Sequence, residues 1–454
     1  SPFYVSDRLR TWNAEGPRRA AVSSLGVGGT NAHVILEEAP PRDVSESGEE
    51  GFDLLCFSAR SSDAMASYSE RYAEFLGATE ESLHNVAYSA AIGRKAFRHR
   101  CVAVASSCLD MQSALSSDQG TGVATHKATD KDASLVFMFA GGGAQYINMG
   151  RDLYQKDERY RAIVDQCLLW ADDLLDFDLR SVMFPDSANE TQAKSDIVRP
   201  TRTLPVLFIT QYAQAKLWEE WGIVPDTLIG HSMGEYTAAC LAGVFSPQSA
   251  LAIVCKRGEL FEAVPAGAML SVMLEQHELQ DYVTGDVSIA AINSDSLSVL
   301  SGPIEQIELI QRRLEEQEVQ CQRIRISVAA HSAMLDPVLD EFQSFLEKID
   351  YQPPTRKVVS NLSGSWLTDE NAVDPQYWVK HLRETVRFAD GLSLILDGVS
   401  DNEMPVLVEV GPGNTLASLA RQHKSTSRDH MVTSSMRHPK ESMNDEAFML
   451  LSLG

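Results

Sequence analysis

Residues 227–244 read TLIGHSMGEYTAACLAGV, and this stretch decides how the fold is interpreted. A short apolar run leads into Gly-His-Ser-Met-Gly, which opens a predicted helix. A strand, a tight turn and a helix in this order form the context of a nucleophile elbow. Gly230 and Gly234 permit the turn, and the helix N-terminus favours negative charge that develops during a reaction. Ser232 is therefore a candidate nucleophile, and a tight turn with only a structural role is the alternative.

A nucleophilic serine needs a base that accepts its proton. His331, in VAAHSAML (residues 328–335), follows a predicted strand and is the candidate; a histidine packed at a strand end is the alternative. His231 directly precedes the serine and points the wrong way along the turn to be its base. We expect His231 to make a local hydrogen bond instead.

The sequence around the serine alternates between strands and helices. SLVFMFAGGGAQ (residues 134–145) reads as a strand entering a glycine turn, residues 203–222 as a helix, and residues 226–232 as a short strand. Such alternation favours a parallel sheet flanked by helices. We therefore predict an α/β fold with an α/β-hydrolase-like large subdomain.

A different pattern follows Gly267. The segments AMLSVML, QHELQDYV, VSIAAINS, SLSVLSG, PIEQIELIQRRLEEQ and CQRIRISVA read as β-α-β-β-α-β. This order is that of a ferredoxin-like unit. The α/β pattern then resumes with RKVVSNL and VLVEVG, so we expect residues 267–329 to form a small inserted subdomain.

Two polar segments divide the N-terminal part of the chain. Residues 37–51 and 116–132 are rich in small, polar or acidic residues and read as linkers or exposed loops. Between them, FDLLCFSA and RHRCVAVAS read as strands, and residues 61–76 as a helix with a serine N-cap. We predict a small α/β domain there.

Composition excludes several classes of function. The formal charge of −24 disfavours non-specific binding to nucleic acid or to a membrane surface. The longest apolar runs are too short to span a membrane, and the N-terminal residues do not resemble a signal peptide, so we expect a cytoplasmic protein. The seven cysteines form no CxxC and no Cys/His cluster, which predicts reduced thiols and no metal site.

Several motifs in order resemble the malonyl-CoA:acyl carrier protein transacylase family, and in particular the acyltransferase domains of modular polyketide synthases. They are GHSMGEYTAACLAGV, FMFAGGGAQYINMGRDLY, CKRGELF, VAAHSAMLDPVLDEF, VSNLSG, YWVKHLRETVRF and VLVEVGPGNTL. SSLGVGGTNAHVILEEAP (residues 23–40) resembles the C-terminal end of a ketosynthase, and SSMRHPKESMNDEAFMLLSLG (residues 434–454) a linker that follows such acyltransferases.

The resemblance implies four parts. They are a ketosynthase remnant (residues 1–38), a ketosynthase-to-acyltransferase linker domain (39–132), an acyltransferase domain (133–426) and a post-acyltransferase linker (427–454). His33 would belong to the remnant. The active cysteine and histidine motifs of a ketosynthase are missing, so we expect no condensation activity.

The resemblance also implies a reaction. Ser232 would attack an acyl-CoA thioester, His331 would take its proton, and the acyl group would pass to the phosphopantetheine thiol of an acyl carrier protein. No bound cofactor is expected, and the remaining domains of a polyketide synthase are expected partners. A backbone carbonyl, which we match to His381, would orient His331, so an acid such as Asp336 need not take part.

Substrate and oxyanion contacts follow from the same family pattern. Arg257 stands 25 positions after Ser232, where members bind the free carboxylate of malonyl-type groups. The backbone N–H groups of Met233 and Gly142 would form the oxyanion hole, although Gly142 stands where a glutamine is usual. Further candidates around the site are Gln145, His231 and Asn293.

The choice of acyl group stays open between two substrates. Malonyl-selective relatives commonly have His-Ala-Phe before the catalytic histidine and methylmalonyl-selective ones Tyr-Ala-Ser, whereas this chain has Val328-Ala329-Ala330. The small Ala330 admits an α-methyl group, and Met233 in place of the glutamine common in methylmalonyl enzymes favours malonyl-CoA. We expect malonyl, with methylmalonyl-CoA or mixed use as the alternative.

Two other classes of function compete with this interpretation. A serine hydrolase or editing thioesterase would use Ser232 and His331 but would not need Arg257. A docking scaffold with an inactive acyltransferase would need none of the three.

Overall fold

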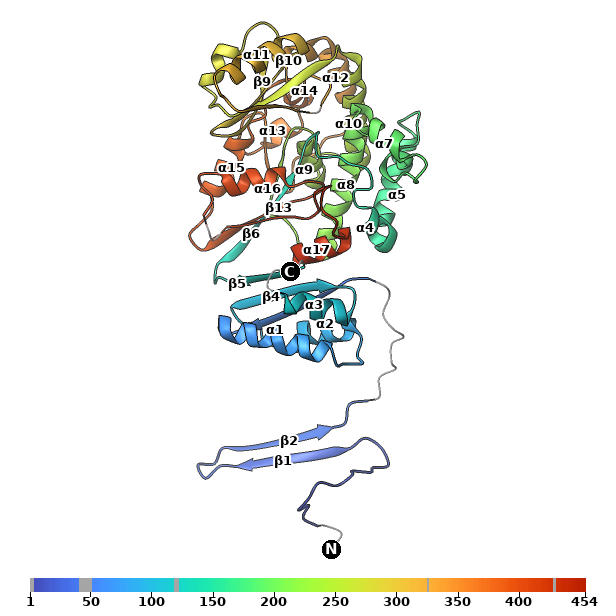
Figure 1. Ribbon diagram of the computed structural model, residues 1–454, viewed down its shortest axis with the longest axis vertical. Helices are drawn as coiled ribbons and strands as arrows, with labels where there is room; N and C mark the ends of the chain where they lie inside the picture. Colours follow the sequence, from blue (N-terminus) through green and yellow to red (C-terminus); the bar gives the residue numbers. More distant parts are fainter. Residues whose placement is uncertain (1–3, 41–50, 118–121, 325, 428–429) are drawn as a thin grey trace. The chain divides into compact units, whose positions relative to one another are not determined.

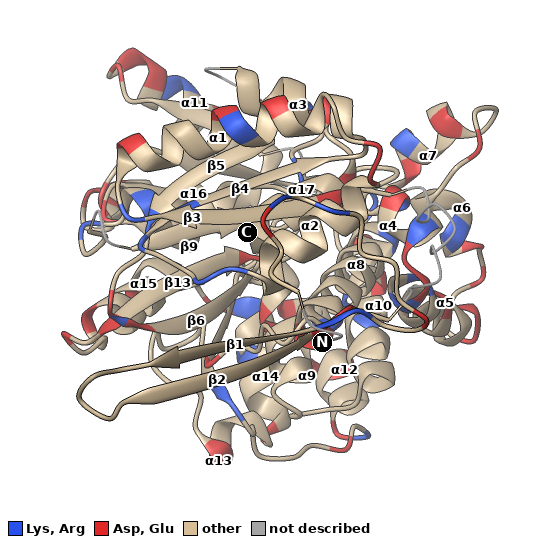
Figure 2. Cartoon of the chain, turned by 90° about the horizontal axis from the view of Figure 1, so that it is seen from below, with Lys and Arg blue, Asp and Glu red and all other residues tan. Residues whose placement is uncertain are grey.

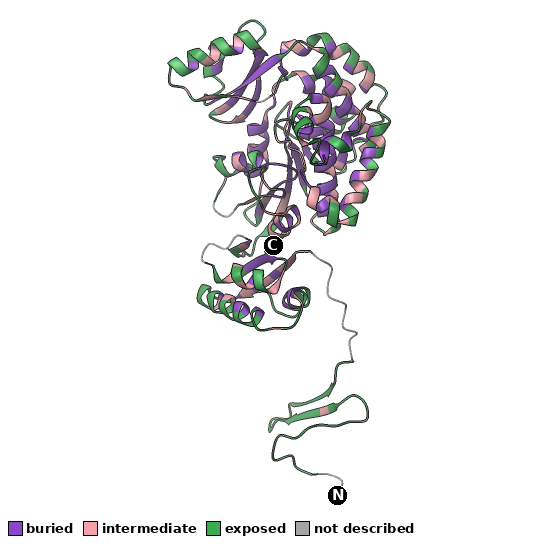
Figure 3. Cartoon of the chain, turned by 45° about the vertical axis from the view of Figure 1, so that its right-hand side comes forward, coloured by how far each residue is buried: buried purple, intermediate pink, exposed green. Residues whose placement is uncertain are grey.

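The computed structural model describes residues 4–40, 51–117, 122–324, 326–427 and 430–454. The chain divides into two compact units, Ser1–Glu50 and Gly51–Gly454. Within the first unit, β1 (Arg19–Leu25) and β2 (Asn31–Glu37) pair as an antiparallel hairpin. Nearly every residue of the hairpin is exposed, as Figure 3 shows by its colour.

The second unit begins with a small α/β domain, as the sequence predicts. Its antiparallel sheet has the order β3-β4-β5. The elements are β3 (Asp53–Ala59), α1 (Ser62–Leu76), α2 (Leu83–Ile92), β4 (His99–Ala105), α3 (Cys108–Ser116) and β5 (Val123–Lys127). The Ser61 hydroxyl caps α1 by accepting a hydrogen bond from the Ala64 N–H.

A five-stranded parallel sheet forms the centre of the large subdomain, which confirms the predicted α/β class (Figure 1). Its order is β12-β7-β6-β13-β14. The strands are β6 (Asp132–Phe139), β7 (Thr227–Gly230), β12 (Lys357–Val359), β13 (Glu403–Glu409) and β14 (Met431–Ser434). Because all five run in one direction, their carboxyl ends meet at one edge, where ligands of parallel sheets usually bind.

Helices pack around this sheet and bury its apolar strands (Figures 1 and 3). They are α4 (Arg151–Lys156), α5 (Glu158–Asp172), α6 (Leu179–Met183), α7 (Glu190–Asp196), α8 (Pro200–Glu220), α9 (Gly234–Leu241), α10 (Pro247–Ala263), α12 (Leu339–Leu346), α13 (Asp369–Ala372), α14 (Pro375–Arg383), α15 (Phe388–Asp397) and α16 (Thr415–Gln422), with a 3₁₀ turn η2 (Ala333–Val338).

The small subdomain has an antiparallel sheet of order β11-β8-β10-β9 and its own apolar core. This strand order is the ferredoxin-like one that the sequence predicts. The elements are β8 (Gly267–Val272), η1 (Glu278–Tyr282), β9 (Ser288–Ser294), β10 (Leu297–Pro303), α11 (Ile304–Glu316) and β11 (Cys321–Arg323).

Two details of the small subdomain differ from the prediction. The first expected helix is a single 3₁₀ segment, η1, because its two buried residues, Leu279 and Tyr282, are three positions apart and a three-residue turn brings them together. The last expected strand ends at Arg323. Beyond it the regular pairing stops, and the Ile326 N–H bonds locally to the Ile324 carbonyl, although the Ile324 N–H and the Ser327 carbonyl still make hydrogen bonds to β8.

The C-terminal segment joins the large subdomain to the small N-terminal domain. β14 pairs with β13 in the central sheet, although it lies beyond residue 426, where we drew the acyltransferase boundary. Helix α17 (Asp445–Leu453) then contacts α4, β3 and β4. The boundary at residue 426 stays a prediction, but it separates two strands that pair with each other.

Charged groups are spread over the surface of the second unit. Figure 2 shows Asp and Glu residues on many helices, with Lys and Arg residues between them. Among the helices of the described ranges, none combines the length and apolar character that a membrane crossing requires.

Candidate active site

Ser232 lies at a strained turn between β7 and α9. Its φ is +52°, a left-handed conformation that non-glycine residues rarely adopt. A Cβ on Gly230 would overlap the backbone of Glu235, and a Cβ on Gly234 would overlap the carbonyl of Phe139. Both glycines of the motif are therefore required, for the tight turn that the sequence predicts and for its close approach to the end of β6.

The structure brings Ser232 and His331 together from positions 99 residues apart. The Ser232 Oγ lies 2.7 Å from the His331 Nε2. The His331 Nδ1 lies 2.9 Å from the Glu384 carbonyl oxygen, which can only accept a hydrogen bond. Nδ1 therefore carries the proton, and Nε2 is free to accept the hydrogen bond from the serine hydroxyl.

The carbonyl that orients His331 belongs to Glu384, so the match to His381 is wrong. Glu384 caps the C-terminus of α14 in an extended conformation, which turns its carbonyl away from the helix. His381 lies within the last turn of α14, and its buried ring packs at 6.3 Å from the ring of His331. Asp336 pairs with Arg383 at the surface and does not contact His331.

Burial lowers the pKa of His331 well below its ordinary value, with a further contribution from the nearby guanidinium of Arg257. The side chain is only 3% exposed. A neutral imidazole is the form that can accept a proton, so His331 is ready to act as a base at neutral pH.

Asn361 holds the turn that carries the serine, and the sequence analysis did not single it out. It follows β12, the neighbour of β7 in the sheet. Its Oδ1 accepts a hydrogen bond of 2.6 Å from the Ser232 N–H, and its Nδ2 donates one of 2.7 Å to the Gly230 carbonyl. The buried amide thus satisfies the backbone on both sides of His231 and fixes the left-handed Ser232.

A buried carboxylate supports this amide. Glu235, in the first turn of α9, is fully buried, and its Oε2 accepts a hydrogen bond of 2.6 Å from the Asn361 N–H. Its other oxygen accepts from the Tyr377 hydroxyl, and Nε2 of His381 lies 3.3 Å from Oε2 without the alignment of a hydrogen bond. Glu235 therefore connects α9, β12 and α14 behind the serine.

Arg257 lies beside the serine, as the spacing in sequence suggests. It is 1% exposed, and its Nη2 is 3.5 Å from the Ser232 Oγ. Its Nε and Nη1 have no hydrogen-bond partner in the described part of the chain. A buried guanidinium with open donors is costly unless an anion occupies the site, so the geometry suits a ligand carboxylate.

The glycine-rich loop after β6 lies against the serine turn. A Cβ on Gly141 would come 2.7 Å from the His231 carbonyl oxygen, so the two segments are in close contact. Gln211 of α8 donates a hydrogen bond of 2.7 Å to the Ala140 carbonyl, and Gln145 accepts one of 2.7 Å from the Gly143 N–H. Both glutamines fix the shape of this loop.

The two proposed oxyanion donors are available for a ligand. Among the described residues, no hydrogen bond uses the N–H of Gly142 or the N–H of Met233. Met233 stands at the N-cap of α9, where backbone N–H groups point out of the helix. These groups can therefore stabilise an anion next to the serine.

His231 links the two subdomains. Its Nε2 lies 2.8 Å from Oδ1 of Asn293 in β9, and its ring packs at 5.5 Å from the ring of Phe388. It makes no hydrogen bond to Ser232, in accordance with the expectation that it is not the base.

The three residues before His331 are all buried. Val328 is 3%, Ala329 1% and Ala330 8% exposed. Ala329 packs against Gly267 at the start of β8, where an added Cβ would overlap it. These three residues therefore pack between the large and the small subdomain, next to His331.

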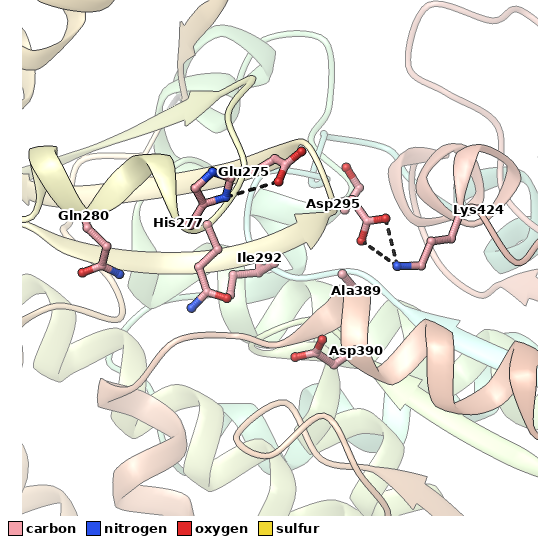
Figure 4. A pocket seen from close by; sticks show the side chains of 10 residues that line it. Glu275, His277, Gln280, Ile292, Asp295, Ala389, Asp390 and Lys424 are labelled. Carbon is pink, nitrogen blue, oxygen red and sulfur yellow. Dashed lines mark hydrogen bonds and ion pairs between the residues drawn. The ribbon is translucent and has the colours of Figure 1, made fainter.

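A cavity of about 700 Å³ lies on the face of β9 opposite to the one on which Asn293 contacts His231 (Figure 4). Most of its polar side chains already have partners: Glu275 lies 3.2 Å from His277, Asp295 pairs with Lys424 at 3.0 Å, and Asp390 pairs with Arg387 at 2.6 Å. Ile292 and Ser294 line it, whereas Asn293 between them bonds to His231. The cavity is therefore separate from the serine.

The site residues that sequence reasoning missed are Asn361, Glu235, Gln211, Tyr377 and Glu384. Two of them stand in motifs that the sequence analysis quoted: Asn361 lies in VSNLSG, at the end of the predicted segment RKVVSNL, and Glu235 directly follows the GHSMG motif. The others act through contacts between helices and loops that are distant in sequence, which local patterns do not reveal.

The chain matches known families over most of its length. Residues 136–449 match the acyl transferase domain family, and residues 53–115 match the family described as CurL-like, PKS C-terminal. The whole chain is 35% identical to one component of the phenolphthiocerol/phthiocerol polyketide synthase of Mycobacterium tuberculosis. It spans only 31% of that relative, so the relative is a much longer protein.

Two solved structures have the same fold. The acyl transferase domain of ZmaA is 32% identical, with a TM-score of 0.81, and the match covers 90% of this chain and 94% of that one. The acyl transferase domain of SpnD, in complex with 2-(pent-4-yn-1-yl)malonyl, is 34% identical, with a TM-score of 0.80 over 90% and 96% of the two chains. With the family match, these likenesses establish that the chain belongs to the acyltransferase domains of modular type I polyketide synthases.

Proposed function

We propose that the chain loads a malonyl-type acyl group from coenzyme A onto the phosphopantetheine thiol of an acyl carrier protein, through an ester on Ser232. The observation that carries this proposal is the buried guanidinium of Arg257, with unpaired donors, next to the serine Oγ. A site that binds only neutral acyl groups would not need a buried cation at this place.

The first half of the reaction forms the ester. The Ser232 Oγ attacks the thioester carbonyl while Nε2 of His331 takes the hydroxyl proton. The carbonyl oxygen becomes an oxyanion, to which the N–H groups of Met233 and Gly142 would donate. The C–S bond then breaks, and His331 returns the proton to the departing thiol of coenzyme A.

The second half repeats these steps in reverse. The carrier-protein thiol attacks the ester carbonyl and gives its proton to His331. The C–O bond to Ser232 breaks, and His331 protonates the serine oxygen. The products are an acyl thioester on the carrier protein and the free enzyme, and no cofactor takes part in any step.

Arg257 would hold the free carboxylate of the acyl group. Charge-assisted hydrogen bonds to a guanidinium contribute about 1.5–3 kcal/mol, which corresponds to a preference of at least tenfold over an acetyl group. The malonyl-type ligand named for the SpnD domain, 34% identical to this chain, supports the same class of substrate here.

Malonyl is our proposed extender, and methylmalonyl or mixed use is the alternative. The bulk of Met233, which is 1% exposed beside the serine, supports malonyl, whereas the small side chain of Ala330 leaves room for an α-methyl group. One methyl group changes binding by only about 1–3 kcal/mol. Competition between malonyl-CoA and methylmalonyl-CoA, read by mass spectrometry of the carrier protein, decides between them.

Transfer to a carrier protein tests the proposal against its rivals. We expect radiolabelled malonyl-CoA to label a holo carrier protein in the presence of this chain but not of Ser232→Ala. A hydrolase would release free malonate faster than it labels the carrier protein, and a scaffold would do neither. Either result would exclude the transferase function.

A further inference from the structure

The guanidinium of Arg257 is held without a carboxylate partner. Buried arginines are normally neutralised by an acidic side chain. In the described part of the chain no acidic side chain forms an ion pair with Arg257, and Nε and Nη1 make no hydrogen bond. Other contacts must therefore keep this cation in place.

Two aromatic rings make these contacts. The guanidinium carbon lies 4.9 Å from the ring centroid of Tyr236 and 5.4 Å from that of Phe261. Tyr236 stands in α9, four residues after Ser232, and Phe261 stands in α10, four residues after Arg257 and so on the same helix face. Both distances lie within the range of a cation–π interaction.

The ring of Tyr236 contributes to this contact, and its hydroxyl also interacts with the guanidinium. This second interaction lacks the geometry of a hydrogen bond, because the hydroxyl has no hydrogen-bond partner in the described part of the chain. Burial raises the pKa of Tyr236 to about 12, so the hydroxyl is neutral at physiological pH and supplies no negative charge to the arginine. A phenylalanine at this position would keep the contact.

We propose that Tyr236 and Phe261 are positioning residues that set the preference for acyl groups with a free carboxylate. Their ring faces stabilise the Arg257 cation without occupying its N–H donors. A carboxylate partner from the protein would instead neutralise the cation and use the donors that the substrate needs. This inference rests on the proposed role of Arg257.

The test compares kcat/KM for loading by malonyl-CoA and by acetyl-CoA. Because a cation–π contact to a desolvated arginine is of moderate strength, Tyr236→Leu or Phe261→Leu should lower the malonyl-to-acetyl ratio by about two- to thirtyfold, mainly through KM for malonyl-CoA. Tyr236→Phe should keep the ratio within about twofold, because it retains the ring.

Two controls separate positioning from loss of stability. Phe208→Leu removes another fully buried ring, in α8, that has no contact with Arg257, and should leave the ratio unchanged. In an Arg257→Ala background, adding Tyr236→Leu should change the ratio by no more than about twofold, because the two residues act as one unit.

The outcomes distinguish this inference from the proposed function. If Arg257→Ala lowers the ratio but neither leucine variant does, the positioning role is wrong and the carboxylate role stands. The same conclusion follows if Tyr236→Leu lowers the ratio equally without Arg257. If Arg257→Ala leaves the ratio unchanged, both claims fail.

Discussion

At the scale of single residues, the site depends on two strained positions. Ser232 and His331 both have positive φ, +52° and +56°, although neither is glycine. Such conformations cost of order 1–3 kcal/mol each and persist only when the surroundings enforce them. At Ser232 the turn is enforced by Asn361, which accepts a hydrogen bond from the Ser232 N–H and donates one to the Gly230 carbonyl.

Replacing Asn361 should therefore impair catalysis and stability together. Asn361→Ala leaves the buried Ser232 N–H and Gly230 carbonyl unpaired, which should lower the free energy of unfolding by about 1–3 kcal/mol. We expect kcat for acyl transfer to fall by at least about tenfold, since a 1 Å displacement of the Oγ can cost about a hundredfold. Urea unfolding and single-turnover kinetics measure both quantities, with Asn371→Ala at an exposed position of α13 as control. Wild-type kcat in Asn361→Ala would show that the amide does not position the serine.

The lowered pKa of His331 predicts the acid side of the pH profile. The base must be neutral, and burial places its pKa below 6.5, so log kcat/KM should stay level down to pH 6.5 and decline only below it. Because Arg257 is the second cause of the lowered pKa, Arg257→Gln should move this decline to higher pH. An acid limb at or above pH 6.5 in the wild type would contradict the buried, neutral base.

The lowered pKa of His331 also makes the free energy of unfolding depend on pH. Below pH 6.5 the unfolded chain binds the proton of His331 more readily than the native chain does. Protonation of His331 therefore favours the unfolded chain. As a result, the free energy of unfolding decreases as the pH falls from 6.5 towards the pKa of His331 in the native chain. His331→Ala should remove that part of the pH dependence of the urea midpoint.

At the scale of elements, α17 attaches the C-terminal segment to the large subdomain. Asp445, at its first position, is 1% exposed and accepts a hydrogen bond of 2.9 Å from the Arg437 Nε. Its N–H donates to Asp152 at the start of α4, at 3.0 Å. Helix starts that share acidic groups in this way are stabilised by the helix dipoles.

Removing the Asp445 side chain should loosen this attachment. Asp445→Ala leaves Arg437 without its carboxylate partner, and because that side chain is partly exposed the expected loss of stability is about 1–2 kcal/mol. Hydrogen exchange in residues 445–453 should accelerate, whereas the exposed Asp401→Ala should behave like the wild type. Unchanged exchange in α17 would show that the pair does not hold the helix.

At the scale of the whole molecule, the residues of the site all belong to the second unit. The first unit contains β1, β2 and His33, whose ring nitrogen lies 2.7 Å from the Ser23 hydroxyl. No core residue of the chain lies in this unit within the described ranges. A chain of residues 51–454 should therefore keep the melting temperature and the loading rate within error. A large loss of either would show that the hairpin supports the second unit.

The fold and the reacting residues could be predicted from the sequence, but the residues that hold them in place could not. Ser232 and Arg257 were found because a local motif and a fixed spacing mark them, and the ferredoxin-like order follows from six segments in sequence. Asn361 was missed because its role arises only when β12 lies beside β7 in the sheet. The carbonyl partner of His331 was misplaced by three residues, since sequence patterns do not resolve which carbonyl at a helix end turns outward.

The formation of an acyl ester on Ser232 is the most direct test of the account. Intact-protein mass spectrometry after brief mixing with malonyl-CoA should detect a single malonyl adduct, which peptide mapping places on Ser232. The adduct should be absent in Ser232→Ala and should disappear from the wild type when a holo carrier protein is added. An adduct that persists in Ser232→Ala, or its complete absence in the wild type, would contradict the account.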